Sequence, residues 1–154
     1  MSKTNKLLYF FISIIFFIFV DIYFSEFILG TLRFKAHENP IFDLIFVQNT
    51  GAAFSILENS QIFLIAFSLT AILLILFYAI RNAEKFSTLA GFWTAILVAG
   101  ISCNVYERIC FGYVRDFFKL NFINFPIFNI SDIFINISVL AIIIIIIKNK
   151  YLKK

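Results

Sequence analysis

The chain has 154 residues, of which 62% are hydrophobic and 14% are charged. A soluble domain is about half apolar and about one quarter charged, and a chain this short has no core large enough to shield so much apolar surface from water. The composition therefore excludes an ordinary soluble domain and predicts one compact membrane domain, while the net charge of +4 comes with no nucleic-acid-binding motif.

Four apolar segments predict membrane-spanning helices, because crossing the hydrocarbon core takes about 20 apolar residues. They cover residues 7–29, 62–80, 86–105 and 130–147. The first begins after Lys3 and Lys6, as a signal peptide would, but no small-residue cleavage site follows its apolar run. We therefore expect a retained helix and a single membrane domain over residues 1–154.

Two longer connections are expected, over residues 30–61 and 106–129. Within them, IFDLIFVQ (41–48) is rich in β-forming residues and partly alternating, and FKLNFINF (118–125) also alternates. We predict that these segments form a small extracytoplasmic β-element resting on the helices. The predicted fold class is thus an all-α membrane protein with four transmembrane helices, one small β-element and a loop.

The distribution of charge predicts the orientation of the helices. Only one of the nine acidic residues, Glu84, lies in the termini or in the connection between the second and third helices. Eight of the thirteen basic residues lie there: Lys3, Lys6, Arg81, Lys85, Lys148, Lys150, Lys153 and Lys154. The positive-inside rule then places both termini in the cytoplasm, so the basic excess reflects topology rather than nucleic-acid binding.

No metal site, disulfide or cofactor is expected. Cys103 and Cys110 would lie roughly 10 Å apart on one helix, which is too far for a disulfide. His37 has neither a second histidine nor a cysteine cluster nearby to complete a zinc site. A serine–lysine dyad is also not expected, because no lysine lies within a predicted membrane segment.

Asp132 lies in the first turn of the fourth predicted helix, where it can act as a helix cap or belong to a polar site in the bundle. Asn129 and Asp132 form a weak variant of the capping box, and the helix dipole favours an acid at this place. Asn129, Asp132 and Asn136, however, are spaced i, i+3, i+7 and form one polar stripe on an otherwise apolar helix. A cap does not explain a polar residue one turn deeper, and such a stripe should face the interior of the bundle.

A second acid, Asp116, lies on the same side of the membrane according to the charge topology. It is flanked by bulky apolar residues, and Asn104 and Arg108 share a helix face nearby, where Arg108 would need anionic partners. Two carboxylates in a partly desolvated site do not both ionise easily. Such a pair can deprotonate a bound water and protonate a leaving amine, as in aspartic proteases. The apolar surroundings of Asp116 favour its neutral form and the helix dipole favours the charged form of Asp132.

Asp21, in the first predicted helix, lies about 15 residues and roughly 22 Å beyond Lys6 along the helix axis. It therefore lies near the outer end of the helix, on the side of the two acids. An interhelical hydrogen bond explains a lone membrane aspartate better than direct catalysis does.

Three motifs together resemble those of the lipoprotein signal peptidases (signal peptidase II). They are VQNTGAAFSIL (47–57), NVYERICFGYVRDFF (104–118) and FPIFNISD (125–132), and with the four-helix layout the resemblance spans nearly the whole chain. It implies that Asp116 and Asp132 form a catalytic dyad. The positions that it implies for the substrate site or its support are Asn49, Gly51, Asn104, Arg108 and Asn129, with Asp21 matching the family's first-helix aspartate.

The chain departs from the usual pattern of that family at three places. Ser25 stands where a lysine usually follows the first-helix aspartate, Cys103 replaces a glycine, and Glu107 replaces an aspartate. These departures concern helix packing and substrate preference. They leave both acids and Arg108 unchanged.

The resemblance implies a membrane-embedded aspartic endopeptidase of the bacterial cytoplasmic (inner) membrane. It would remove the signal peptide from diacylglyceryl-modified prolipoproteins, cutting before the lipid-modified cysteine, near the extracytoplasmic face and without a cofactor. We expect a monomer whose partners are this substrate and membrane lipids. The residues alone leave two alternatives: a small four-helix transporter, channel or accessory subunit, in which the acids bind ions or protons, and a structural assembly factor.

Overall fold

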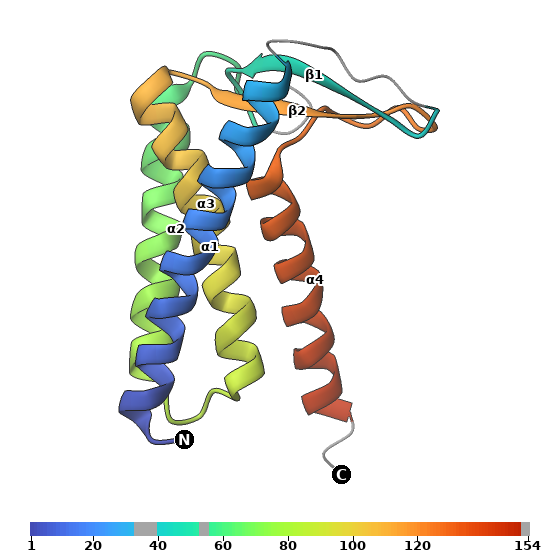
Figure 1. Ribbon diagram of the computed structural model, residues 1–154. Helices are drawn as coiled ribbons and strands as arrows, with labels where there is room; N and C mark the ends of the chain where they lie inside the picture. Colours follow the sequence, from blue (N-terminus) through green and yellow to red (C-terminus); the bar gives the residue numbers. More distant parts are fainter. Residues whose placement is uncertain (33–39, 53–55, 152–154) are drawn as a thin grey trace.

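The computed structural model of the chain describes residues 1–32, 40–52 and 56–151. The helices form a bundle, and a small sheet lies across one end of it (Figure 1). Each helix is long and apolar enough to cross a membrane. Both termini lie at the end opposite the sheet (Figure 1). The helices are α1 (Lys3–Leu32), α2 (Gln61–Arg81), α3 (Thr88–Phe111) and α4 (Ile130–Tyr151), and the strands are β1 (Phe42–Asn49) and β2 (Val114–Leu120). The predicted fold class is confirmed.

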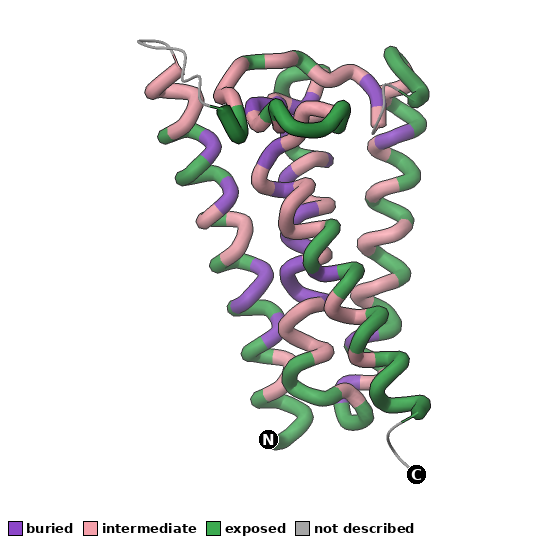
Figure 2. Tube along the Cα trace, turned by 90° about the vertical axis from the view of Figure 1, so that its right-hand side faces the viewer, coloured by how far each residue is buried: buried purple, intermediate pink, exposed green. Residues whose placement is uncertain are grey.

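The central element of the bundle is α3, which contacts each of the other three helices. Its buried residues are mostly small, and Ala95, Ala99 and Gly100 allow neighbouring backbones to approach closely. Buried positions follow α3 through the middle of the bundle, whereas the outer faces of the other helices are exposed (Figure 2). Those outer faces carry large apolar side chains such as Ile15, Leu73 and Ile144, as a lipid-facing surface requires.

The third helix is longer than the sequence indicated. It was predicted to end near residue 105, but α3 continues to Phe111 and ends at Gly112, whose φ of 81° is in the left-handed region. The polar residues of this last turn suggested a loop. They are helical because Glu107 is buried against the sheet and Gly112 provides the cap, with its N–H donating to Arg108 O.

The two strands pair antiparallel, with Phe42 opposite Leu120 and Asn49 opposite Val114. The prediction for the first strand is confirmed to within one residue. That for the second overlaps β2 only over residues 118–120, because the chain turns after Leu120, where Asn121 N donates to Ile41 O. His37 and the last part of the NTGAAFS motif lie outside the described residues.

Two features of the sheet lie beside Asp116. A register shift between Leu44 and Val47 adds one residue to β1 next to the Val47–Asp116 pair, and such a bulge bends the strand that carries it. Phe128, just before α4, then exchanges backbone hydrogen bonds with Phe118. The start of α4 is thereby fixed against β2.

Candidate active site

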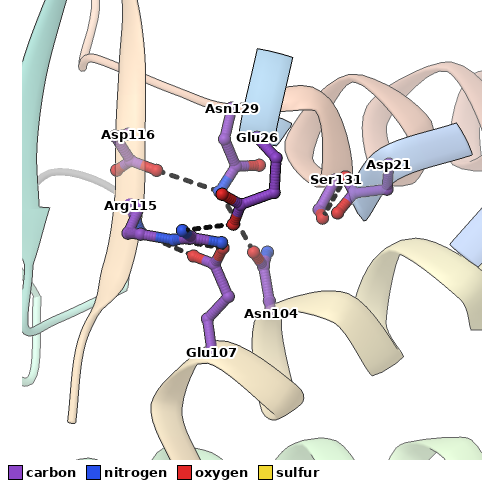
Figure 3. Close-up of polar contacts among 8 residues, drawn as sticks. All are labelled: Asp21, Glu26, Asn104, Glu107, Arg115, Asp116, Asn129 and Ser131. Atoms are coloured by element: carbon purple, nitrogen blue, oxygen red, sulfur yellow. Dashed lines mark hydrogen bonds and ion pairs between the residues drawn. The ribbon is translucent and has the colours of Figure 1, made fainter. Parts of the chain in front are cut away.

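The two acids singled out in the sequence lie on different elements and meet at one residue, Asn129. Asp116 is in β2 and 1% exposed, and Asp132 is in the first turn of α4. Asn129 Nδ2 donates to Asp116 Oδ1 at 3.0 Å, and Asn129 N donates to Asp132 Oδ2 at 3.2 Å (Figure 3 shows the first contact). Because a single residue bridges the two carboxylates, they occupy one site.

The capping interpretation of Asp132 is confirmed. Asp132 N donates to Asn129 Oδ1 at 2.8 Å, while the Asp132 carboxylate accepts from Asn129 N, which is the reciprocal pair of a capping box. The other carboxylate oxygen, Oδ1, accepts from Asn104 Nδ2 at 3.0 Å. The cap therefore holds the Asp132 side chain in one orientation.

Side chains from the first outer connection and from α3 complete the polar cluster. Asn49 Nδ2 donates to Asp116 Oδ2 at 2.8 Å, and Asn49 Oδ1 accepts from Gly51 N at 2.9 Å. Arg108 lies close enough for its charge to act on the acids, as expected, but the hydrogen bonds found for its guanidinium go to carbonyl oxygens: Nη2 donates to Gly51 O at 2.8 Å and Nη1 to Asn104 O at 3.2 Å. Carbonyl oxygens bind the guanidinium because the Gly51 turn lies against the C-terminal end of α3.

The pKa of Asp116 is raised to about 7. Burial is the largest cause, because a carboxylate loses its hydration, and the nearby charge of Asp132 adds to it. The hydrogen bond from Asn49 and the charge of Arg108 act in the opposite direction. The predicted tendency of Asp116 toward its neutral form thus agrees with its surroundings.

Asp21 makes the interhelical hydrogen bond that the sequence analysis favoured. Ser131 Oγ donates to Asp21 Oδ1 at 2.7 Å, and both residues are buried (Figure 3). Ser131 precedes Asp132, so α1 holds the first turn of α4. Ser25 and Cys103, two of the departures from the family pattern, are buried in the same region of the bundle.

The predicted polar stripe is wrong at Asn136. Its side chain is exposed and Nδ2 donates to Asp132 O of the same helix, rather than facing the bundle interior. Asn136 instead lines a cavity of about 400 Å³ that also contacts Asp132. Two more wall residues, Phe128 and Ile135, are apolar. A second cavity of about 390 Å³ lies against Asp116 and Asn49.

An ion-pair cluster beside the acids was not found by sequence reasoning. Arg115 contacts Glu107 through Nε and Nη2 at 2.8 and 2.7 Å, and Arg115 N donates to the other Glu107 oxygen at 2.7 Å. Glu26 of α1 contacts Arg115 Nη1 at 2.7 Å (Figure 3). The sequence did contain a signal for this cluster, because Glu107 directly precedes Arg108 and Arg115 directly precedes Asp116. The cluster ties β2 to α3 and α1 at the residue before Asp116.

Replacing Glu107 should weaken this attachment. We expect Glu107→Gln to lower the free energy of unfolding by about 2 kcal/mol, because it removes the charge from a nearly buried, multiply hydrogen-bonded pair. The matched change Glu26→Gln should cost less than about 1 kcal/mol, because that carboxylate is 57% exposed. Denaturant unfolding of both variants in the same detergent measures the difference, and equal losses would contradict the distinction.

Comparison with known proteins identifies the chain's relatives. The family profile described as signal peptidase (SPase) II, peptidase A8, matches residues 12–148. A protein of Streptococcus thermophilus named lipoprotein signal peptidase is 38% identical over 110 residues, 71% of each chain. One of the same name from Caldicellulosiruptor bescii is 40% identical over 108 residues, 70% of this chain and 69% of its own.

A solved structure described as a bacterial membrane enzyme has the same fold. It superposes with a TM-score of 0.81 at 25% identity, over 94% of this chain and 91% of its own. The family match covers most of the chain, including the motifs around Asn49, Asp116 and Asp132. The chain therefore belongs to the signal peptidase II family of peptidases.

Proposed function

We propose that the protein is an aspartic endopeptidase that removes the signal peptide from diacylglyceryl-modified prolipoproteins, cutting before the lipid-modified cysteine. The observation that carries the proposal is the bridging of Asp116 and Asp132 by Asn129. Each carboxylate accepts two hydrogen bonds, but their environments differ: Asp116 lies in a strand and is nearly fully buried, whereas Asp132 lies at a helix N-terminus, where the helix dipole favours a negative charge. Paired carboxylates in unlike environments are suited to opposite protonation roles.

In the proposed reaction Asp132 starts ionised and Asp116 starts protonated. Asp132 takes a proton from water as the water oxygen attacks the scissile carbonyl carbon, and Asp116 gives its proton to the carbonyl oxygen. Asp132 then passes its proton to the amide nitrogen, Asp116 recovers one from the gem-diol, and the C–N bond breaks. The two acids return to their starting states, so no cofactor takes part.

The position of the site suits a substrate held in the membrane. The apolar wall of the cavity at Asp132, with Phe128 and Ile135, can receive a lipid-modified residue that arrives sideways from the bilayer. The site lies at the sheet end of the bundle, away from both termini (Figure 1). We therefore place the termini in the cytoplasm, as the basic residues indicate, and the site near the extracytoplasmic face.

Cleavage of a defined substrate tests the proposed function. The purified protein in lipid vesicles should release the signal peptide from a prolipoprotein whose cysteine carries diacylglyceryl, and mass spectrometry should locate the cut before that cysteine. The same precursor without the lipid should be cut far more slowly. Failure to cut the lipid-modified precursor would contradict the proposal, and so would equal cutting of both.

The pH dependence of cleavage should show the titration of Asp116. Because its pKa is raised to about 7, the required proton is present below that pH and lost above it. We expect kcat/KM to fall as pH rises through about 7, with the apparent value belonging to the pair of acids. Asn49→Leu removes a hydrogen bond that lowers this pKa, so it should move the fall to higher pH. An unmoved basic limb in a folded variant would argue against Asp116 as the titrating group.

A further inference from the structure

Another cavity, separate from the two beside the acids, lies at the end of the bundle near the termini. It is a groove of about 540 Å³ between α2, α3 and α4, a volume in the range of sites for small molecules and cofactors. The lower half of α4 stands apart from the other helices in Figure 1. The groove is therefore bounded by α4 on one side and by α2 and α3 on the other.

The lining of this groove changes from apolar to polar along its length. Its deep part is formed by aliphatic residues, among them Leu74, Leu97 and Ile142. At the end near the termini the lining residues include Asn82, Lys85 and Asn149. The apolar part of this groove, at membrane depth, suits an acyl chain. Its polar end, which carries a lysine and two asparagine side chains, suits a phosphate group.

Lys85, at the polar end of the groove, lies in a turn that is hydrogen-bonded to α1. Lys6 of α1 donates to Glu84 O at 3.0 Å and to Phe86 O at 2.7 Å, which fixes the turn that carries Lys85. The Glu84 carboxylate is paired with Lys3, and none of the described residues that line the groove is acidic. Lys148 and Lys150 add positive charge at the same end of α4.

We propose that this groove binds a phospholipid with an anionic headgroup, with the phosphate at Lys85 and an acyl chain between α2 and α4. A substrate's signal helix or a second copy of this chain would match the positive charge at the polar end of the groove less well. The signal helix of a substrate carries a basic segment at its cytoplasmic end, which Lys85, Lys148 and Lys150 would repel. A second copy of this chain would bring the same basic end. A bound lipid would support the C-terminal half of α4, and this assignment does not depend on the peptidase activity.

Native mass spectrometry of the detergent-purified protein tests the assignment. The protein is mixed with equal amounts of phosphatidylglycerol and phosphatidylcholine of identical acyl chains, and the retained lipids are counted. We expect preferential retention of phosphatidylglycerol. Lys85→Gln should weaken it about fivefold, the effect of one lysine beside an anionic lipid surface, and leave phosphatidylcholine unchanged.

Two further variants separate a site from general surface charge. Arg81→Gln makes the same charge change at the same end of the bundle, but Arg81 lies over the Phe77 ring and outside the lining of the groove, so it should leave lipid retention as in the wild type. Ala90→Phe, which fills the groove from α3, should reduce retention of both lipids. Circular dichroism shows whether each variant is folded. Equal retention of the two lipids by the wild type, equal losses for Lys85→Gln and Arg81→Gln, or unchanged binding to folded Ala90→Phe would each overturn the proposal.

Discussion

Asp132→Asn and Asp116→Asn are each expected to lower the rate of prolipoprotein cleavage about 10³- to 10⁴-fold. An amide can neither take a proton from water and pass it to the leaving amine, as proposed for Asp132, nor give one to the carbonyl oxygen, as proposed for Asp116. General acid–base groups contribute factors of about 10² to 10⁴ each. Asparagine keeps the size of the acid but only one of its two accepted hydrogen bonds, because the asparagine Nδ2 donates instead of accepting. Circular dichroism shows whether each variant is folded, and in a folded variant the loss should appear in kcat.

The other acid of the sheet, Asp43, provides the matched control. Asp43 lies in β1 and pairs with Lys119 at 3.5 Å, on the same sheet as Asp116. Asp43→Asn removes the same charge from the pair with Lys119 and not from the bridged pair of acids, so cleavage should stay within about twofold of the wild type. If folded Asp116→Asn or Asp132→Asn cuts at a rate similar to the control, the dyad is wrong.

Gly100→Ala should disturb both stability and cleavage through the start of α4. A Cβ added at Gly100 would lie 2.7 Å from Ser131 O and 3.0 Å from Ile135 Cγ1. The first neighbour is backbone, so the first turn of α4 must shift, and overpacking of this kind costs about 1–3 kcal/mol. Because Asp132 is in that turn, and misplacement by about 1 Å can cost 10²-fold, we expect about a hundredfold loss of kcat/KM.

Gly91→Ala tests whether the effect is due to contact with α4. Gly91 is also in α3, but a Cβ there meets nothing within 4 Å. Alanine is a better helix former than glycine by about 0.5–1 kcal/mol, so this variant should be as stable as the wild type or slightly more stable. Thermal unfolding and cleavage of both variants provide the comparison. Equal behaviour of Gly91→Ala and Gly100→Ala would show that the α3–α4 contact does not position Asp132.

The parts of the fold that follow from local pattern could be predicted from the sequence. Long apolar runs indicated the helices to within about four residues at every end except the C-terminal end of α3, since lipid leaves few other structures for such a segment. The capping box at Asn129 and Asp132 was also local, because its partners are three residues apart. Burial of Asp116 followed from its bulky neighbours in the sequence.

The contacts that depend on tertiary placement could not be predicted. Arg108 needed a partner, but only the path of the chain near Gly51 decides that a carbonyl oxygen serves rather than a carboxylate. The extension of α3 to Phe111 depends on the burial of Glu107 against Arg115, a residue of the following strand. Asn136 matched the helical spacing of a stripe, yet its side chain is exposed and lines the cavity that Asp132 also lines.

Tracing where the oxygen atom of the attacking water is incorporated tests most directly whether Asp116 and Asp132 together activate water. A single turnover of the protein with lipid-modified prolipoprotein in ¹⁸O-labelled water is followed by mass spectrometry of the released signal peptide and of peptides that contain Asp116 or Asp132. We expect one labelled oxygen in the new carboxylate of the signal peptide and none in either aspartate. Label in Asp116 or Asp132 would mean that an aspartate attacks the substrate as a nucleophile, and the water-activating dyad would be wrong.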